Sequence, residues 1–175
     1  MRYNRMGTAF KAVHCRDDKP IWASGIGELD GLFDEANQPW LHNYLADGGE
    51  QSILDVYFRA ASAPSLYIAL LTADPGETGT PATMAENAGT GYARIQLNRN
   101  STDFPTLALD TGDYKVTAIA KVFTAGGAWS ACTHMGIVTS ASGTTGALIA
   151  VQALGATRTL INTDTLSVTY ATKLQ

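Results

Sequence analysis

The sequence predicts an all-β protein, mainly an antiparallel sandwich or jelly-roll-like barrel, with one N-terminal helix and an extended N-terminal arm. Short apolar stretches with strand-like alternation recur from residue 65 onward, and Gly-, Ser- and Asn-rich turns separate them. The stretch before Pro64 has helical spacing instead. A chain of 175 residues is long enough for one domain with a packed core. We assign residues 1–37 to the arm and residues 38–175 to the domain.

The composition excludes several classes of protein. Charged residues make up 16% of the chain, the net charge is -4 and the isoelectric point is near 5.2. This acidic total argues against a basic nucleic-acid-binding protein. No apolar run approaches the ~18 residues of a membrane helix, and the N-terminus does not resemble a signal peptide. Cys15 and Cys132 are too few for a disulfide scaffold or a zinc site, although a bridge between them stays open.

Charge is divided unevenly over the first 58 residues, which comprise the predicted arm and most of the predicted helix. Five of the 12 basic residues lie within the first 19 positions, whereas residues 20–58 hold seven acidic residues and no basic one. This polarity is typical of an arm that lies on another surface, and the alternative is a solvated leader. The apolar pairs Ile21-Trp22 and Leu32-Phe33 are the candidate docking residues for such a surface.

The predicted helix begins near residue 38 and ends before Pro64. Its apolar residues recur at the spacing of one helix face, in two groups that Gly48-Gly49 separates, so we expect a bend there. The two groups are Trp40, Leu41, Tyr44 and Leu45, and then Ile53, Leu54, Tyr57 and Phe58. Trp40 is expected in the core.

Strands are predicted after Pro64, where β-branched and aromatic residues alternate with polar ones. The expected strands are 65–72, 92–97, 116–123, 133–139, 147–154, 158–161 and 166–170. Between Lys121 and Arg158 the chain has no charged residue. Exposed sheet edges usually carry charges that prevent association, so this stretch predicts a surface covered by other copies or other proteins. A Thr- and Ser-rich face of a monomer is the alternative.

A search for catalytic motifs gives mostly negative results. The chain has no P-loop, no zinc-binding helix with paired histidines and no nucleophile elbow. Asp110-Thr111-Gly112 resembles the active-site sequence of an aspartic protease, but the supporting segment of such an enzyme is missing and a turn is the simpler interpretation. We therefore expect no enzyme, no cofactor and no metal site, and we interpret His134 as structural.

The order of several short motifs resembles a family of small tailed-bacteriophage virion proteins, commonly labelled tail fibre or head-decoration proteins. The resemblance covers residues 38–175 and leaves residues 1–37 outside it. It is carried by the helix before Phe58 and by the segments Ala63–Gly76, Gly91–Arg94, Ala128-Trp129, Thr133–Ile137, Gly146–Leu148, Arg158–Leu160 and Asp164–Leu166. It implies a virion structural protein, assembled in the host cytoplasm, without catalytic residues.

These observations lead to a phage structural protein that assembles as a homo-oligomer, with the arm docking on its neighbours. The expected partners are copies of itself and the major capsid protein or other virion proteins, with no nucleic acid and no membrane. Tryptophan is frequent at interface hot spots, so Trp22 and Trp129 are candidate anchors, with a place in the core as the alternative. Head decoration is the first interpretation and a tail, neck or tail-fibre position the second. A carbohydrate-binding module is an alternative from another class.

Overall fold

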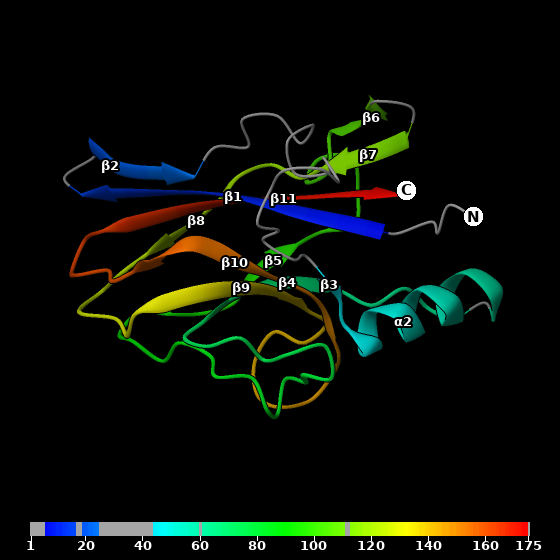
Figure 1. Ribbon diagram of the computed structural model, residues 1–175, viewed down its shortest axis with the longest axis horizontal. Helices are drawn as coiled ribbons and strands as arrows, with labels where there is room; N and C mark the ends of the chain where they lie inside the picture. The colour runs from blue at the N-terminus through cyan, green and yellow to red at the C-terminus, as the bar shows by residue number, and fades with distance from the viewer. Residues whose placement is uncertain (1–5, 17–18, 25–43, 60, 111–112, 175) are drawn as a thin grey trace, which may run out of the picture.

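Two antiparallel sheets face each other in the structure, a computed structural model that describes residues 6–16, 19–24, 44–59, 61–110 and 113–174 (Figure 1). The six-stranded sheet is built from β1 (Met6–Arg16), β2 (Lys19–Ser24), β6 (Thr106–Asp110), β7 (Asp113–Thr117), β8 (Lys121–Thr124) and β11 (Thr165–Leu174). The five-stranded sheet is built from β3 (Tyr44–Leu45), β4 (Leu66–Leu71), β5 (Ile95–Leu97), β9 (Cys132–Val138) and β10 (Leu148–Arg158). The predicted all-β class is confirmed.

The strand order explains how distant parts of the chain meet. The six-stranded sheet has the order β2-β1-β11-β7-β6, and β8 pairs with β11 next to β7. The five-stranded sheet has the order β3-β10-β9-β4-β5. All of these pairs are antiparallel, and β1 runs along β11 from Met6 opposite Leu174 to Cys15 opposite Thr165.

Two strands, β1 and β2, lie within the range that the sequence assigned to the arm. The sequence analysis missed them because Met6–Arg16 lacks a clean apolar alternation, and its strand pairing comes from β11 at the other end of the chain. Residues 25–43, which include Leu32, Phe33 and Trp40, lie outside the described residues.

The helix, α2 (Asp47–Phe58), is shorter than predicted. Tyr44 and Leu45 form β3 and pair with β10, so the first apolar group of the predicted helix is not helical where it is described. Gly48 and Gly49 lie in the first helical turn and do not bend the helix. A Cβ on Gly48 would lie 3.0 Å from the Ala147 Cβ, so the glycine allows the helix to approach β10 closely.

Most of the predicted strands are present, but two predictions are wrong where the chain leaves a sheet. The predicted strand 116–123 is two strands, because the chain leaves the sheet at Ala118–Ala120 and the Ile119 amide donates to the Asp103 carbonyl. The short strand expected at 158–161 is absent: Arg158 ends β10 and the next residues form a loop.

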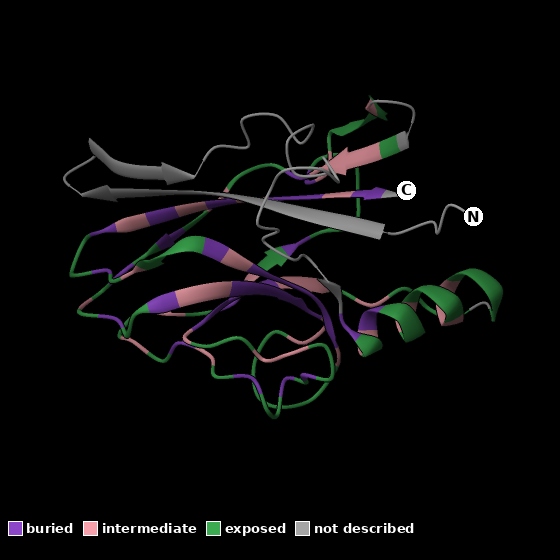
Figure 2. Cartoon of the chain, in the orientation of Figure 1, coloured by how far each residue is buried: buried purple, intermediate pink, exposed green. Residues whose placement is uncertain are grey.

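The main core fills the space between the two sheets. Its buried residues include Ile68 and Leu70 from β4, Ile137 from β9 and Leu166 and Val168 from β11. Figure 2 shows the central strands of the five-stranded sheet mostly buried, whereas most of α2 is exposed. This core confirms the sandwich arrangement.

A second core lies on the other face of the five-stranded sheet. Strand β4 serves both cores, because Ile68 and Leu70 point to the first and Ala69 and Leu71 to the second. The second cluster contains Ala46, Ala69, Leu71, Met84, Val138, Leu148 and Val151. Met84 comes from the long segment between β4 and β5, so this segment covers the outer face of the sheet. Both faces of β9 and of the Leu148–Leu154 part of β10 are therefore largely buried within the chain itself.

The burial of β9 and β10 changes the interpretation of the uncharged stretch. Its strand segments lack charge because they are buried on two sides, as central strands with covered faces usually are. The exposed uncharged residues lie mainly in the turn 141–146 and near the end of β10, at residues 155–157, with others on β8 and in the loop before β9. The stretch thus supports burial within the monomer more directly than coverage by other copies.

Gly89 allows the loop before β5 to pack on Trp129. A Cβ at this position would overlap the Trp129 ring, and Gly89 has no positive φ that would otherwise explain it. The Trp129 Nε1–H donates to the Thr90 carbonyl at 2.8 Å, which fixes the ring against the same loop. The close approach therefore requires glycine.

We expect Gly89→Ala to lower the free energy of unfolding by about 2 kcal/mol, because the Trp129 ring must move. The indole N–H signal of Trp129 in an NMR spectrum should shift at the same time. Gly143→Ala is the control, since Gly143 has φ +72° and open space around it, so it tests backbone strain of about 1 kcal/mol alone. An unchanged Trp129 signal in Gly89→Ala would contradict the packing described here.

Candidate interaction surfaces

Arg94 links the segment between β4 and β5 to the turn after β9 through hydrogen bonds. Its guanidinium forms a bidentate pair with Glu86, at 2.8 Å from Nε to Oε1 and 2.6 Å from Nη2 to Oε2. The remaining contacts go to the Ser140 carbonyl at 2.9 Å, the Ser140 hydroxyl at 2.8 Å and the Gly143 carbonyl at 2.8 Å. The hydrogen bond with Glu86 raises the pKa of Arg94 further. This buried side chain is thus held by one carboxylate and two turn residues.

Tyr92 joins the same cluster from the core side. Its hydroxyl donates to Glu86 Oε1 at 2.7 Å and accepts from the Leu70 amide at 3.0 Å. Its ring stacks on Phe123 and meets Trp129 edge to face. Burial, reinforced by the hydrogen bond to Glu86, raises the pKa of Tyr92 well above its usual range. Tyr92 is therefore neutral, and its hydroxyl both donates and accepts a hydrogen bond within the protein. We assign it a structural role.

A second polar cluster surrounds the buried carboxylate of Asp103. Its Oδ2 accepts from the Asn98 amide at 2.7 Å, from Asn98 Nδ2 at 3.0 Å and from Lys121 Nζ at 3.0 Å. The backbone hydrogen bond from Asn98, followed by the one from Lys121, lowers the pKa of Asp103. The cluster fixes the turn between β5 and β6 to the start of β8.

Asp110, the residue of the protease-like motif, lies at the end of β6. Its carboxylate is 2.9 Å from Lys115 Nζ and 3.9 Å from Lys173 Nζ. The hydrogen bond from Lys115 lowers the pKa of Asp110. In an aspartic protease two carboxylates share a proton, which requires a raised pKa on one of them. Thr111 and Gly112 lie outside the described residues.

The histidine and cysteine in β9 occupy structural positions. His134 contacts the Thr133 hydroxyl at 2.9 Å and lies 3.8 Å from the Asp74 carboxylate. Cys132 is a buried free thiol that accepts a hydrogen bond from Asn87 Nδ2 at 3.2 Å. Among the described residues, no group of three or more His, Cys, Asp or Glu could hold a metal ion. In the same part of the chain no helix is long and apolar enough to span a membrane.

The candidate interface residues have different positions. Trp129 is 3% exposed and packs in the main core, which is the alternative that the sequence left open for it. Ile21 and Trp22 lie in β2, whose backbone pairs with β1. Leu32 and Phe33 lie outside the described residues. The docking of residues 21–33 on a neighbour stays a prediction.

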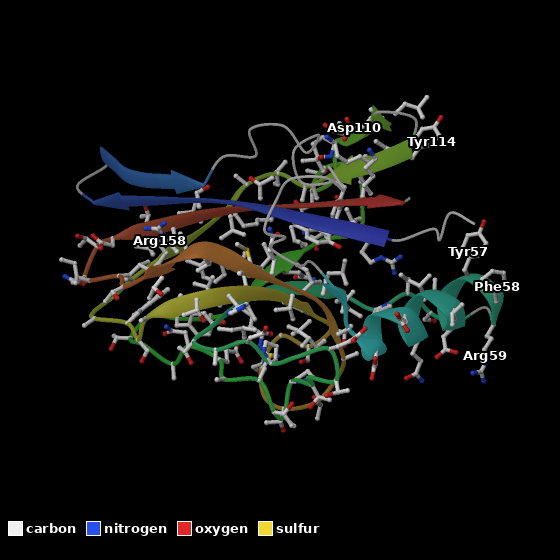
Figure 3. The ribbon with its side chains drawn as sticks, in the orientation of Figure 1. Tyr57, Phe58, Arg59, Asp110, Tyr114 and Arg158 are labelled. Carbon is white, nitrogen blue, oxygen red and sulfur yellow. The ribbon has the colours of Figure 1, made fainter. Side chains whose placement is uncertain are left out.

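The exposed apolar side chains gather at two other places. The first, which we call the helix patch, consists of Ile53, Leu54, Tyr57 and Phe58 on α2, where Tyr57 is 82% and Phe58 74% exposed. Figure 3 shows Tyr57 and Phe58 at the far end of the helix, away from the sheets. The sequence predicted these residues as one face of a helix, but the only α2 residue that is buried among those described is Gly49.

The second place, which we call the edge patch, consists of Leu107, Leu109 and Tyr114 on the β6–β7 hairpin. These side chains are 68%, 63% and 57% exposed, respectively. The hairpin lies at the edge of the six-stranded sheet, where Figure 3 shows Tyr114 pointing outward. The sequence analysis treated this region as a turn, although the alternation in Thr106–Asp110 is the signal that could have revealed a strand with a leucine face.

A comparison with family models identifies the chain. Residues 42–174 match the Gp80 family, described as Podophage GP4 fiber I protein gp80, and this range is well over half of the chain. The chain belongs to the Gp80 family. It is therefore a bacteriophage virion structural protein, as the resemblance implied. No curated protein matches the chain.

The segments that carried the resemblance have a structural explanation in this Gp80 protein. Gly91–Arg94 supplies both Tyr92 and Arg94 to the polar cluster, and Ala128-Trp129 supplies the ring that Gly89 admits. Gly91 itself has φ +80° and lies against Gly126, so its backbone requires glycine. These motifs maintain the fold. The exposed apolar patches lie on α2, which also helps to carry the resemblance, and on the β6–β7 hairpin, which does not.

We expect Arg94→Met to lower the free energy of unfolding by about 3 kcal/mol, because it leaves the partly buried Glu86 carboxylate without its partner. Arg59→Met is the matched control: Arg59 also pairs with a carboxylate, Asp55, at 3.0 Å, but its side chain is exposed. That variant should lose at most about 0.5 kcal/mol. Chemical denaturation measures both values, and equal losses would show that the Arg94 cluster does not fasten the segment.

Asp103 predicts a loss of stability in acid. A carboxylate with a lowered pKa in the folded state stabilises the fold above its unfolded pKa of about 4, and this contribution is lost as the pH falls through the folded pKa. Asp103→Asn should therefore be less stable than the unmodified chain at pH 7, with a difference that shrinks below about pH 4. Lys121→Met should reduce the pH dependence without abolishing it. Thermal melts across this range measure the effect, and a constant difference would contradict it.

Proposed function

We propose that this Gp80 protein is a subunit of the phage tail fibre that acts through protein–protein contacts and not through catalysis. The family match over residues 42–174 carries the proposal, because the family description names a fibre protein. It favours the second interpretation of the sequence, a tail or tail-fibre position, over head decoration.

The exposed apolar patches support a role in assembly. Contiguous apolar side chains at the surface of a soluble domain commonly mark interaction sites. The helix patch and the edge patch present such side chains on two separate elements. In the proposed role these surfaces contact sister copies or other virion proteins, and the expected homo-oligomer is part of the proposal.

The carbohydrate-binding alternative gains no support from Trp129. Stacking on a sugar ring requires an exposed aromatic face, whereas Trp129 is buried and its Nε1–H is bonded to Thr90. The polar groups around Arg94 and those around Asp103 form hydrogen bonds within each cluster. We therefore assign these clusters a role in stabilising the fold and not in binding a ligand.

Electron microscopy of phage particles tests the tail-fibre role. Gold-labelled antibodies against the chain should mark the tail, and antibodies against the major capsid protein serve as the control that marks the head. Quantitative mass spectrometry of purified particles should give a few copies for each tail. One copy for each subunit of the head lattice, with label spread over the head, would contradict the proposal and favour capsid decoration.

A further inference from the structure

Among the described residues, β6 forms an unprotected edge of the six-stranded sheet. Proteins usually protect edge strands by shortness, lysine, proline or bulges, since an open edge pairs readily with another strand. Among the described strands, β3 and β5 are short, β8 begins with Lys121, and β2 contains Lys19 and Pro20. By contrast, the first four residues of β6, Thr106–Leu109, carry no charge, and all of them are exposed.

The exposed leucines of β6 continue the face of the sheet that lines the main core. Leu107 is opposite Val116 on β7, and Val116 is opposite Thr172 on β11. Directly opposed residues share a face, and so do alternate residues of one strand. Thr172 therefore shares its face with Tyr170, which is buried in the main core. The apolar face thus extends beyond the core to the edge, where the edge patch remains uncovered.

The sequence of β6 is complementary to itself in the antiparallel direction. When two copies are paired about Ala108, each Leu107 lies opposite Leu109 of the second copy, and each Ala108 lies opposite its counterpart. Asp110 then faces Thr106 of the second copy, so no like charges are opposed. All five residues of the strand are paired in this register. A two-fold contact of this kind uses the same surface on both copies.

We propose that the β6 edge binds the β6 edge of a second copy of this chain, antiparallel and centred on Ala108, so that two six-stranded sheets become one continuous sheet. This inference rests on the proposed assembly of sister copies, and it names the strand that makes the contact. The backbone groups of β6 that point away from β7 supply the hydrogen bonds, and the edge patches of both copies cover each other.

The first test measures the mass of the full chain in solution by analytical ultracentrifugation over a range of concentrations. The unmodified chain should self-associate. The double variant Leu107→Lys/Leu109→Lys should weaken association at least about tenfold, because it places like charges opposite each other across the contact. The double variant Val122→Lys/Ile161→Lys also adds two charges at exposed apolar positions, and it should associate like the unmodified chain.

The second test uses cross-linking to read the register. Under oxidising conditions Ala108→Cys should form a covalent dimer, because opposed residues of paired strands are within disulfide distance. Thr124→Cys, at an exposed position on β8, is the matched control and should add no dimer beyond that of the unmodified chain, which carries Cys15 and Cys132.

The outcomes separate this inference from the tail-fibre role. A chain that is monomeric at all concentrations, or an oligomer that the leucine variant does not weaken, would overturn the β6 contact. Weakened association without an Ala108→Cys dimer would show that the edge patch meets a different surface, and would also overturn it. Neither result changes where the protein lies on the particle, which the gold label measures independently.

Discussion

The ion pair between Arg94 and Glu86 is the interaction on which the arrangement of this half of the molecule depends. The pair orients the Arg94 guanidinium, which bonds to Ser140 and Gly143 in the turn after β9 and so attaches the segment between β4 and β5 to the five-stranded sheet. Met84 from that segment covers the second core. Tyr92 connects the same carboxylate to the backbone of β4 and to the aromatic rings of the main core. One partly buried carboxylate therefore links the two cores, and its loss would affect both.

The segment between β4 and β5, which Arg94 attaches to the five-stranded sheet, also accounts for the distribution of charge. Strands that are covered on both faces have few solvent-exposed positions for lysine or glutamate, and β9 and the Leu148–Leu154 part of β10 are such strands. The scarcity of charge after Lys121 therefore reflects a covering segment from the same chain. What remains exposed and apolar is concentrated in the helix patch and the edge patch, outside that stretch.

Sequence reasoning predicted the sandwich because β4, β9 and β11 carry their own apolar and turn signals. It failed for β1 and β3, whose pairing depends on distant strands and not on local pattern. Trp129 illustrates the same limit for sites: composition marks tryptophan as an anchor, but only the packing on Gly89 places it inside. The edge patch was missed because a five-residue strand beside an Asp-Thr-Gly sequence was interpreted as a turn.

The pairing of β1 with β11 has a consequence for synthesis on the ribosome. Among the described strands β1 is translated first, yet the strand beside it in the sheet, β11, is translated last. The side of β1 that pairs with β11 therefore stays unpaired until β11 has been made, while β1 can already pair with β2. The six-stranded sheet is therefore completed only after β11 has been made, and until then the open side of this hairpin is available for pairing with another chain.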